Sequence, residues 1–330
     1  MYDLIRDFPA QLRDSLKIGD AATIHTTLAE PVRHVLVCGL GGSGIGGDLA
    51  REVLRNDLEV PLAVNKGYFL PGYVNHHTLV ILCSYSGNTE ETLSVAEECK
   101  LRGYKPIVIT SGGKLRDLAA QEAWDTILIP PGLPPRACIG YSALQIFFIL
   151  YKLGLIGDSF ITDTLSTAHL LYNEQTEIQN ETRALAEKLL RKIIILYTED
   201  TYESVALRIK QQINENAKMH CWYNAVPEVN HNELVGWRQT HDNLAVIFLL
   251  TGNEFQRNHH RIQFMKGLID GLKTDVYEVT ALGNNLFEKH FYLIHWGDWL
   301  SYYLAELQGH DPTEVTEITN LKKHLEGIRE

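Results

Sequence analysis

The chain has 330 residues, 45% of them hydrophobic and 22% charged, as is typical of a soluble globular protein long enough for two ordinary domains. Its formal net charge of −11 argues against a nucleic-acid surface, so an anionic ligand would have to be held by a local cluster of donors. The five cysteines show no C-x-x-C spacing, which predicts a reduced, cytoplasmic protein. The sequence contains no stretch of roughly 18 apolar residues, so no membrane span is predicted.

The first half of the chain alternates between strand and helix patterns. Apolar residues at roughly helical spacing predict one or two short amphipathic helices in residues 1–30, packed outside a sheet. Strands are then predicted at 34–40, 60–65, 78–83, 105–110 and 125–129, and helices at 46–56, 88–102 and 113–121. Apolar strands separated by helices indicate a parallel sheet that is covered on both faces.

Two loops of this half combine glycine with small hydroxyl residues. The strand 34–40 leads into the glycine-rich turn Gly41-Gly-Ser-Gly-Ile-Gly-Gly47, and a helix is expected to open at Asp48. The strand 78–83 leads into Ser84-Tyr-Ser-Gly-Asn-Thr-Glu-Glu-Thr92. Backbone N–H groups, hydroxyls and a helix N-terminus can therefore converge on one anion. The two loops together predict a phosphate cradle.

The glycine turn alone leaves another interpretation open. Gly39, Gly41 and Gly44 fit the G-x-G-x-x-G dinucleotide pattern, and Glu59 lies near the position of the acidic residue that holds a ribose. The second loop favours the phosphate cradle, because a nicotinamide site does not need a Ser-x-Ser-Gly-Asn-Thr arrangement after the next strand. A third interpretation is purely structural, with the serines only capping helices.

A proline-rich segment separates this alternation from the next helix. Residues 129–141 contain too many prolines for a helix or a central strand, so we expect an ordered loop that presents Arg136. A fixed arginine could stabilise negative charge that develops on a reacting oxygen. The alternative is an ordinary surface arginine. A helix is predicted over 142–154, before Gly157.

The second half repeats this architecture without a glycine-rich phosphate loop. A polar, helix-favouring run over 158–190 is predicted to connect two domains, 1–157 and 191–330. Strands are predicted at 192–198, 219–225, 244–250 and 274–279, and helices at 201–217, 256–271 and 286–308. The predicted fold class is α/β, with two doubly wound subdomains, each a parallel sheet flanked by helices. The aromatic helix 286–308 could pack on a second subunit.

The segment Asn230-His-Asn-Glu233 carries the first candidate for a general base. Moving a proton between adjacent carbons needs a carboxylate held against a C–H bond, and Glu233 stands in a segment dense with polar groups. The alternative is that Glu233 only caps the helix that carries Trp237. His231 is expected to be structural.

Histidines and lysines farther along are further candidates for ligand contacts. His259 and His260 follow the strand 244–250, where α/β folds place ligand-facing groups, and histidine exchanges a proton near neutrality. Adjacent helical side chains point about 100° apart, so at most one of the two histidines faces the site. We favour His259. The alternative, that either histidine is only a solvent-exposed surface residue, stays open. Lys322 or Lys323, in a last helix, could contact ligand oxygens, although lysines near a helix C-terminus often serve only the macrodipole.

In combination, these motifs resemble those of the sugar isomerase (SIS) domain. Over nearly the whole length, the chain resembles the bifunctional phosphoglucose/phosphomannose isomerases, a branch of the phosphoglucose isomerase superfamily built from two SIS domains. The resemblance rests on six segments in order: Gly41–Gly47, Ser84–Thr89, Pro134–Arg136, Asn230–Glu233, His259–Arg261 and Ile318–Lys322.

The resemblance assigns a role to each motif. The substrate phosphate would be held by the two loops, through Gly42, Ser43, Ser84, Ser86 and Thr89. Glu233 would shuttle a proton between C2 and C1, and Arg136 would stabilise the charge of the intermediate. His259 and Lys322 would open the sugar ring, with His260 and Lys323 as alternates.

The implied reaction is aldose–ketose isomerisation, in which glucose 6-phosphate and mannose 6-phosphate are interconverted with fructose 6-phosphate through a cis-enediol. The resemblance implies no cofactor and no metal, and the fourteen histidines form neither an H-E-x-x-H motif nor a set at zinc spacing. It also implies a homodimer in which the histidine comes from the neighbouring subunit. One alternative is another SIS-domain phosphosugar isomerase. The other is a non-catalytic sugar-phosphate sensor, and the retained candidate base, acid and cation argue against the sensor.

Overall fold

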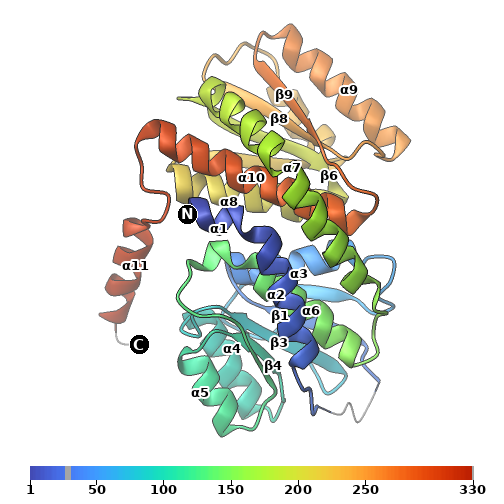
Figure 1. The fold of residues 1–330 in the computed structure, drawn as a ribbon, viewed down its shortest axis with the longest axis vertical. Coiled ribbons are helices and arrows are strands. Elements are labelled where there is room, and N and C mark those ends of the chain that lie inside the picture. The colour runs from blue at the N-terminus through green and yellow to red at the C-terminus, as the bar shows by residue number, and fades with distance from the viewer. Residues whose placement is uncertain (27–30, 329–330) are drawn as a thin grey trace.

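Two parallel β-sheets, one in each half of the chain, organise the structure (Figure 1). The computed structural model describes residues 1–26 and 31–328, so the part of the N-terminal helix prediction that falls on 27–30 lies outside the described residues. Helices flank both sheets, and the predicted α/β fold class is confirmed. None of the described helices combines the length and the apolar character that crossing a membrane would need.

The first sheet has five strands in the order β2-β1-β3-β4-β5. Its strands are β1 (His34–Cys38), β2 (Leu62–Asn65), β3 (Thr78–Ser84), β4 (Ile107–Thr110) and β5 (Thr126–Leu128). Its helices are α1 (Tyr2–Arg6), α2 (Phe8–Ala21), α3 (Gly42–Val53), α4 (Glu90–Leu101), α5 (Gly113–Gln121) and α6 (Ile139–Lys152). The inner strands are continuous apolar runs because helices cover both faces of the sheet.

The second sheet has four parallel strands in the order β7-β6-β8-β9. Its strands are β6 (Ile193–Glu199), β7 (Cys221–Val226), β8 (Leu244–Leu250) and β9 (Asp275–Thr280). The helices of this half are α7 (Ser159–Leu189), α8 (Glu203–Ala217), α9 (Gln256–Gly271), α10 (Leu286–Gln308) and α11 (Thr316–Glu326).

Helices of both halves meet between the two sheets. α3 and α6 cover the inner face of the first sheet, α8 and α10 lie on the inner side of the second, and α3 packs against α8. The apolar residues of this middle layer form one continuous core, from Val35 in β1 to Trp296 in α10. α4 and α5 close the outer face of the first sheet, and α9 closes that of the second. The two halves therefore share a core.

The long helices α7 and α10 lie side by side in this shared core. α7 is continuous over 31 residues, and its buried side chains face the interior. In α10, Trp296 and Trp299 are at most 2% exposed within the single chain. The tryptophans of α10 therefore complete the core of their own chain, and the packing of this helix on a second subunit stays a prediction. The division into domains at 157 and 191 stays a prediction.

The first residues of the chain complete the core of its last third. The ring of Tyr2 lies edge-on to Trp299 at 5.0 Å, and Phe8 stacks on His295 at 5.7 Å. Figure 1 shows α1, in dark blue, beside α10 in orange-red, while α2 continues alongside α6. The two predicted N-terminal helices thus pack outside the sheets, with one face of each buried against the rest of the chain.

α3 begins at Gly42 and not at Asp48, where the sequence pattern placed its start. Gly41 is its N-cap, with a φ of +53° that favours glycine. A Cβ on Gly44 would lie 2.4 Å from the carbonyl oxygen of Gly39, so only glycine lets the first turn approach β1 this closely. The glycine-rich segment is therefore the first turn of the helix itself, and it places helix N–H groups at the edge of the sheet.

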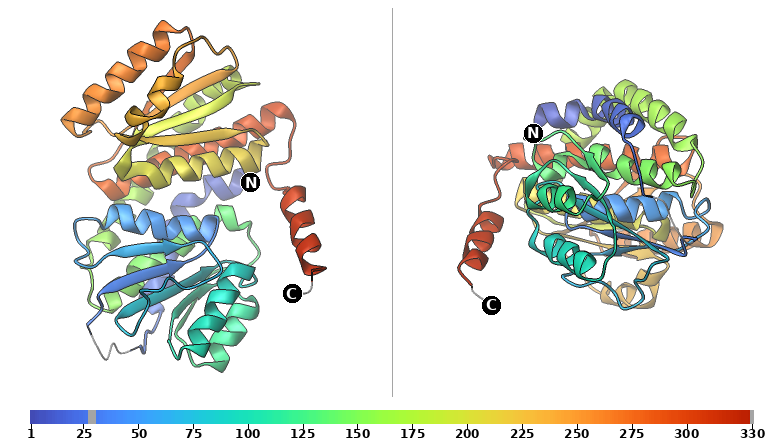
Figure 2. Two further views of the ribbon diagram at one scale, coloured as in Figure 1. Left: turned by 180° about the vertical axis from the view of Figure 1, so that it is seen from behind. Right: turned by 90° about the horizontal axis from the view of Figure 1, so that it is seen from below.

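α11 extends away from the body of the chain (Figure 2). It begins at Thr316, after an irregular segment from Gly309 to Val315. Every residue from Thr316 to Leu325 is exposed, including the apolar Ile318 and Leu321.

We expect His295 to make the protein acid-sensitive. Its side chain is fully buried, and burial lowers the pKa of His295 from 6.5 to about 3. Between these values the unfolded chain binds a proton that the native state does not, so stability falls as the pH drops below 6.5. The expected cost at pH 5.0 is about 2 kcal/mol of unfolding free energy.

Urea denaturation of the wild type and of His295→Asn at pH 7.5 and 5.0 measures this effect, because titrating carboxylates contribute equally to both proteins. The wild type should lose about 2 kcal/mol more than the variant between the two pH values. Equal losses in the two proteins would show that His295 does not carry the acid sensitivity.

Candidate active site

Hydroxyl side chains gather at the carboxyl edge of the first sheet. β1 and β3 are neighbours in the sheet, so the loops that follow them emerge side by side. Ser84 Oγ and Thr89 Oγ1 lie 2.8 Å apart, and Ser43 Oγ accepts a hydrogen bond from the Tyr85 N–H at 3.2 Å. Ser86 is exposed in the same loop. The structure thus brings together the two loops that the sequence pattern singled out, and we call them the cradle: residues 41–47 and 84–89.

Close backbone approaches at glycines pack each cradle segment against a neighbouring loop. Gly87 has a φ of +65°, and a Cβ there would lie 1.7 Å from the carbonyl oxygen of Gly112. A Cβ on Gly42 would lie 3.0 Å from the carbonyl oxygen of Pro135, which precedes Arg136. Larger residues would therefore push the loops apart, and the proline-rich turn packs directly against the glycine-rich turn.

Helix capping alone does not explain the cradle hydroxyls. Thr89 is the N-cap residue of α4, but its side chain makes no capping bond to the described residues. Ser86 Oγ accepts from the Asn88 N–H at 3.2 Å within the loop, and the N-cap of α3 is Gly41, which has no side chain. The first N–H groups of α3 and α4 are thus not capped by these side chains, and helix N-termini of this kind attract anions.

Arg136 is buried, at 6% exposure, and its side chain points into the second half of the chain. Its Nε donates to Asn216 Oδ1 at 2.7 Å, and its Nη2 donates to the carbonyl oxygens of Pro312 and Thr313 at 2.5 and 2.9 Å. Its Nη1 lies 3.5 Å from Glu215 Oε2. Burial lowers the pKa of Arg136, and nearby carboxylates oppose that shift. Arg136 is thus not a surface arginine, and the predicted loop directs it inward.

The backbone of Arg136 is also held by the second half. Arg208, 1% exposed, donates to the Arg136 carbonyl oxygen at 2.9 Å and pairs with both carboxylate oxygens of Asp298 at 3.0 and 2.9 Å. Gln212 donates to the same carboxylate at 2.7 Å. This buried network of α8 and α10 fixes the proline-rich turn, and with it one wall of the cradle.

Glu233 lies at the first residue of a short 3-10 turn after β7, and its carboxylate faces the second sheet. Its Oε1 accepts from the Tyr197 hydroxyl and from Trp222 Nε1 at 3.3 Å, and its Oε2 accepts from Asn224 Nδ2 at 3.0 Å. The turn is capped by Asn232, whose side chain accepts from the Glu233 N–H. The carboxylate of Glu233 is therefore positioned by side chains from β6 and β7 and is not itself a helix cap.

Tyr197 is the central donor of this group. Burial raises the pKa of Tyr197, and the neighbouring Glu233 carboxylate adds to the shift. The phenol therefore stays protonated and donates its hydrogen to Glu233, while its oxygen accepts from Trp237 Nε1 at 3.0 Å. Trp237 is buried against the outer face of the second sheet. The phenol that holds the carboxylate is thus itself held by a buried side chain.

The other predicted residues lie on surfaces of the chain. The side chain of His259 is 52% exposed near the start of α9 and lies 3.9 Å from Glu254 Oε2, and its neighbour His260 is exposed as well. Lys322 and Lys323 are exposed on α11. Among the described residues, the structure gives none of these four side chains a contact with Glu233 or the cradle.

The sequence pattern did not single out the partners of Glu233. Trp222 and Asn224 are two residues apart on a strand, a spacing that places both side chains on one face. Asn224 is a polar residue on the same face as Trp222 in a largely apolar strand, and this pattern could have indicated that the two side chains share a ligand or a partner. Tyr197 gave no such signal, because a tyrosine in a buried strand is usually a packing residue.

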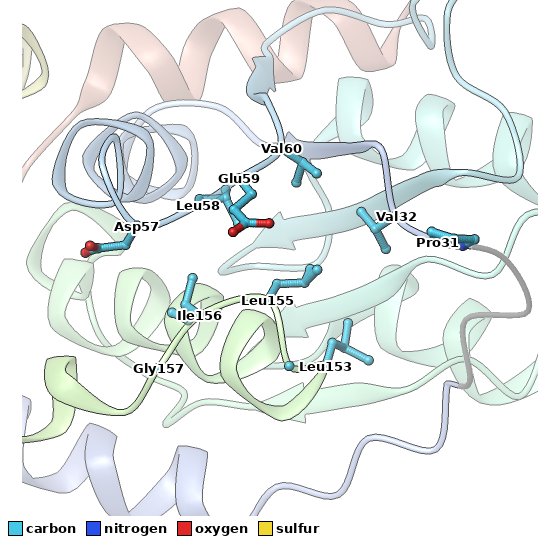
Figure 3. Close-up of a pocket in the computed structure, with 11 residues that line it drawn as sticks. Pro31, Val32, Asp57, Leu58, Glu59, Val60, Leu153, Leu155, Ile156 and Gly157 are labelled. Carbon is cyan, nitrogen blue, oxygen red and sulfur yellow. The ribbon is translucent and has the colours of Figure 1, made fainter.

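A cavity of about 750 Å³ lies away from the cradle (Figure 3). It is lined by residues that precede β1 and β2 and that follow α6, so it opens at the amino ends of the strands. Its polar side chains include the carboxylates of Asp57 and Glu59, which repel an anion. Within residues 1–26 and 31–328, no three His, Cys, Asp or Glu side chains cluster as metal ligands would.

Two family models match the chain. The SIS domain matches residues 31–130, and the bacterial phospho-glucose isomerase C-terminal SIS domain matches residues 178–325. These segments contain the cradle and Glu233, respectively.

Proteins of known name are similar over the full length. A bifunctional phosphoglucose/phosphomannose isomerase of Caldicellulosiruptor bescii is 39% identical over 100% of both chains. One of Aquifex aeolicus is 35% identical over 89% of this chain and 91% of its own. The C-terminal domain of glucosamine-fructose-6-phosphate aminotransferase from Francisella tularensis shares the fold, with a TM-score of 0.74 and 17% identity over 95% of this chain and 98% of that one.

Proposed function

The chain belongs to the family of bifunctional phosphoglucose/phosphomannose isomerases, and on that premise we propose that it interconverts glucose 6-phosphate and mannose 6-phosphate with fructose 6-phosphate. The observation that carries the proposal is the pairing, in one chain, of a hydroxyl-lined phosphate cradle with a carboxylate held by three side-chain donors. A sugar-phosphate sensor would need the phosphate cradle but not the positioned carboxylate.

Glu233 is the base in this proposal. It takes a proton from C2 of the open-chain sugar and returns it to C1, by way of a cis-enediol. Two donors occupy Oε1, and only Asn224 donates to Oε2 among the described residues. Because each carboxylate oxygen has about two lone pairs, Oε2 keeps one for the proton. Acceptance of both C2 epimers requires that the intermediate rotate or that C2 be reachable from either face.

Arg136 stabilises the charge of the intermediate. Its Nε and Nη2 are committed to Asn216 and to two carbonyl groups, whereas Nη1 has only the 3.5 Å contact with Glu215. The Nη1 group is therefore the one that turns toward an anionic oxygen. A preorganised donor of this kind contributes roughly 3 kcal/mol to transition-state stabilisation.

The active site is completed by a second copy of the chain. His259 and Lys322 open the sugar ring, with His260 and Lys323 as alternates, and the histidine comes from the neighbouring subunit of a homodimer. The exposure of α9 histidines and of α11 in the single chain supports this arrangement. The reaction needs neither a metal nor a cofactor, and the five buried free thiols support a reduced, cytoplasmic location.

The test is production of fructose 6-phosphate by the purified protein, first from glucose 6-phosphate and then from mannose 6-phosphate, after exhaustive chelation. Turnover of both sugars is expected, at a rate that chelation does not change. Turnover of neither, with phosphosugars still binding, would point to another sugar phosphate or to sensing. Recovery of activity only on adding a divalent cation would overturn the metal-independent reaction.

Removing two cradle hydroxyls should weaken substrate binding more than turnover. Each hydrogen bond to a charged group contributes about 1.5–3 kcal/mol, so Ser86→Ala with Thr89→Ala should raise KM by about 100-fold or more. Thr126→Ala, on β5 at the amino edge of the same sheet, is the control and should leave KM unchanged. An unchanged KM in the double variant would remove these hydroxyls from the phosphate site.

A further inference from the structure

The cradle contains no cation of its own. Its two segments, residues 41–47 and 84–89, carry only glycines, hydroxyls and neutral side chains, and Glu90 and Glu91 follow directly. A phosphate monoester carries about −1.5 to −2 charges at neutral pH, and the protein as a whole has a formal charge of −11. A cation from outside the two loops is therefore needed to offset the repulsion.

Lys66 lies beside the glycine-rich turn. It follows directly on β2, whose last residue, Asn65, pairs with Cys38 of β1 and accepts a hydrogen bond from the Gly39 N–H at 3.1 Å. Its side chain then crosses the first turn of α3, since a Cβ built on Gly44 would lie 3.5 Å from Lys66 Cε. The lysine thus reaches the turn that carries Ser43, at the same carboxyl edge of the sheet.

Asp48 holds the ammonium group in this position. Lys66 Nζ lies 2.6 Å from Asp48 Oδ2, and Arg51 Nη1 lies 3.2 Å from the other oxygen, Oδ1. The Asp48 side chain is 7% exposed, whereas that of Lys66 is 43% exposed. An ammonium group has three donors, so with one directed to Asp48 the others can reach a ligand from the solvent side.

We propose that Lys66 binds the phosphate group of the substrate and that Asp48 positions it for this contact. The inference rests on the proposed function for the identity of the sugar, but the phosphate contact can be tested without turnover. Lys66 supplies the positive charge that the cradle lacks, and the buried carboxylate keeps a flexible side chain from leaving the site.

The competing explanation is that Lys66 only neutralises the buried Asp48. The two explanations differ in the double variant. If neutralisation were the only role, removing both charges together, in Asp48→Asn with Lys66→Gln, would restore wild-type affinity. If Lys66 contacts phosphate, the double variant binds as weakly as Lys66→Gln alone.

The experiment measures dissociation constants of inorganic phosphate and of glucose 6-phosphate by calorimetry on the full-length protein. Lys66→Gln should weaken both ligands about 10-fold, as expected for a lost charge-assisted hydrogen bond, while Lys66→Arg should keep most of the affinity. Lys100→Gln is the matched control, because Lys100 pairs with Glu122 at 3.0 Å with a similar 40% exposure but lies in the last turn of α4. It should bind like the wild type.

Thermal unfolding of each variant confirms that it is folded before binding is compared. Wild-type affinity in Lys66→Gln, or recovery of affinity in the double variant, would overturn the proposal. If neither glucose nor mannose 6-phosphate is isomerised but inorganic phosphate binding still depends on Lys66, the proposed function fails while the role of Lys66 stands.

Discussion

Replacing Glu233 by glutamine is expected to lower kcat by about 10²–10⁴-fold, the range that a positioned general base contributes. Glutamine keeps the size of the side chain, and its carbonyl oxygen can still accept from Tyr197 and Trp222, so the fold and the substrate Kd should stay close to those of the wild type. Steady-state kinetics with fructose 6-phosphate, together with calorimetric binding, separates the two effects.

Glu228 offers a matched control for this experiment. It lies in the 3-10 turn just before Glu233, and its carboxylate accepts from Asn232 Nδ2 at 2.8 Å. Glu228→Gln changes the local charge by the same amount and should keep near-native turnover. Near-native turnover in Glu233→Gln would mean that another group removes the proton.

Breaking the buried pair of Arg208 and Asp298 is expected to cost about 3–5 kcal/mol of unfolding free energy, because Arg208→Met leaves an uncompensated carboxylate in the core. Burial raises the pKa of Asp298, and Arg208 opposes that shift. Without the arginine, the carboxyl group would have to take up a proton or draw in water. The same substitution frees the Arg136 carbonyl group, so kcat should fall as well.

A second variant distinguishes the loss of the pair from the exposure of its remaining member. Arg208→Met with Asp298→Leu removes both charges and should recover most of the lost stability, since apolar replacements of buried pairs are often nearly neutral. The partly exposed pair of Lys192 and Asp275, at 2.8 Å, is the control, and Lys192→Met should cost less than about 1 kcal/mol. Equal stability in all three variants would show that leaving the Asp298 carboxylate without Arg208 does not destabilise the fold.

Much of the fold follows from local pattern. The apolar run of β8 and the helical spacing of α9 and α10 predict these elements at their observed boundaries, because both signals depend on residues close in sequence. The start of α3 is not predicted correctly by local pattern, because it depends on residues far apart in sequence. Glycine disfavours a helix by its own propensity, and close approaches to other segments, such as that of Gly44 to Gly39 and of Gly46 to Ala143, explain why glycines lie inside it.

Some parts of the candidate site also follow from local pattern, whereas others depend on contacts between distant residues. The cradle could be predicted, since strand order alone brings its two loops to one edge of the sheet. The environment of Arg136 could not, because its partners lie about 80 and 176 residues farther along the chain, and no local pattern encodes that distance. The positions of His259 and Lys322 relative to Glu233 stay predictions, because one chain does not bring them together.

The contact between Tyr2 and Trp299 has a consequence for how the protein is made. The ribosome releases α1 first, but its packing partner in α10 emerges only near the end of translation. At about 5–20 residues per second, the interval is roughly 15–60 s. Throughout that time, the apolar face of α1 has no native partner in α10, whereas α2 can already pack on α6 and α7. Nascent chains should therefore be most vulnerable to aggregation just before the last tenth of the protein is synthesised, and most in need of a chaperone that holds an amphipathic N-terminus.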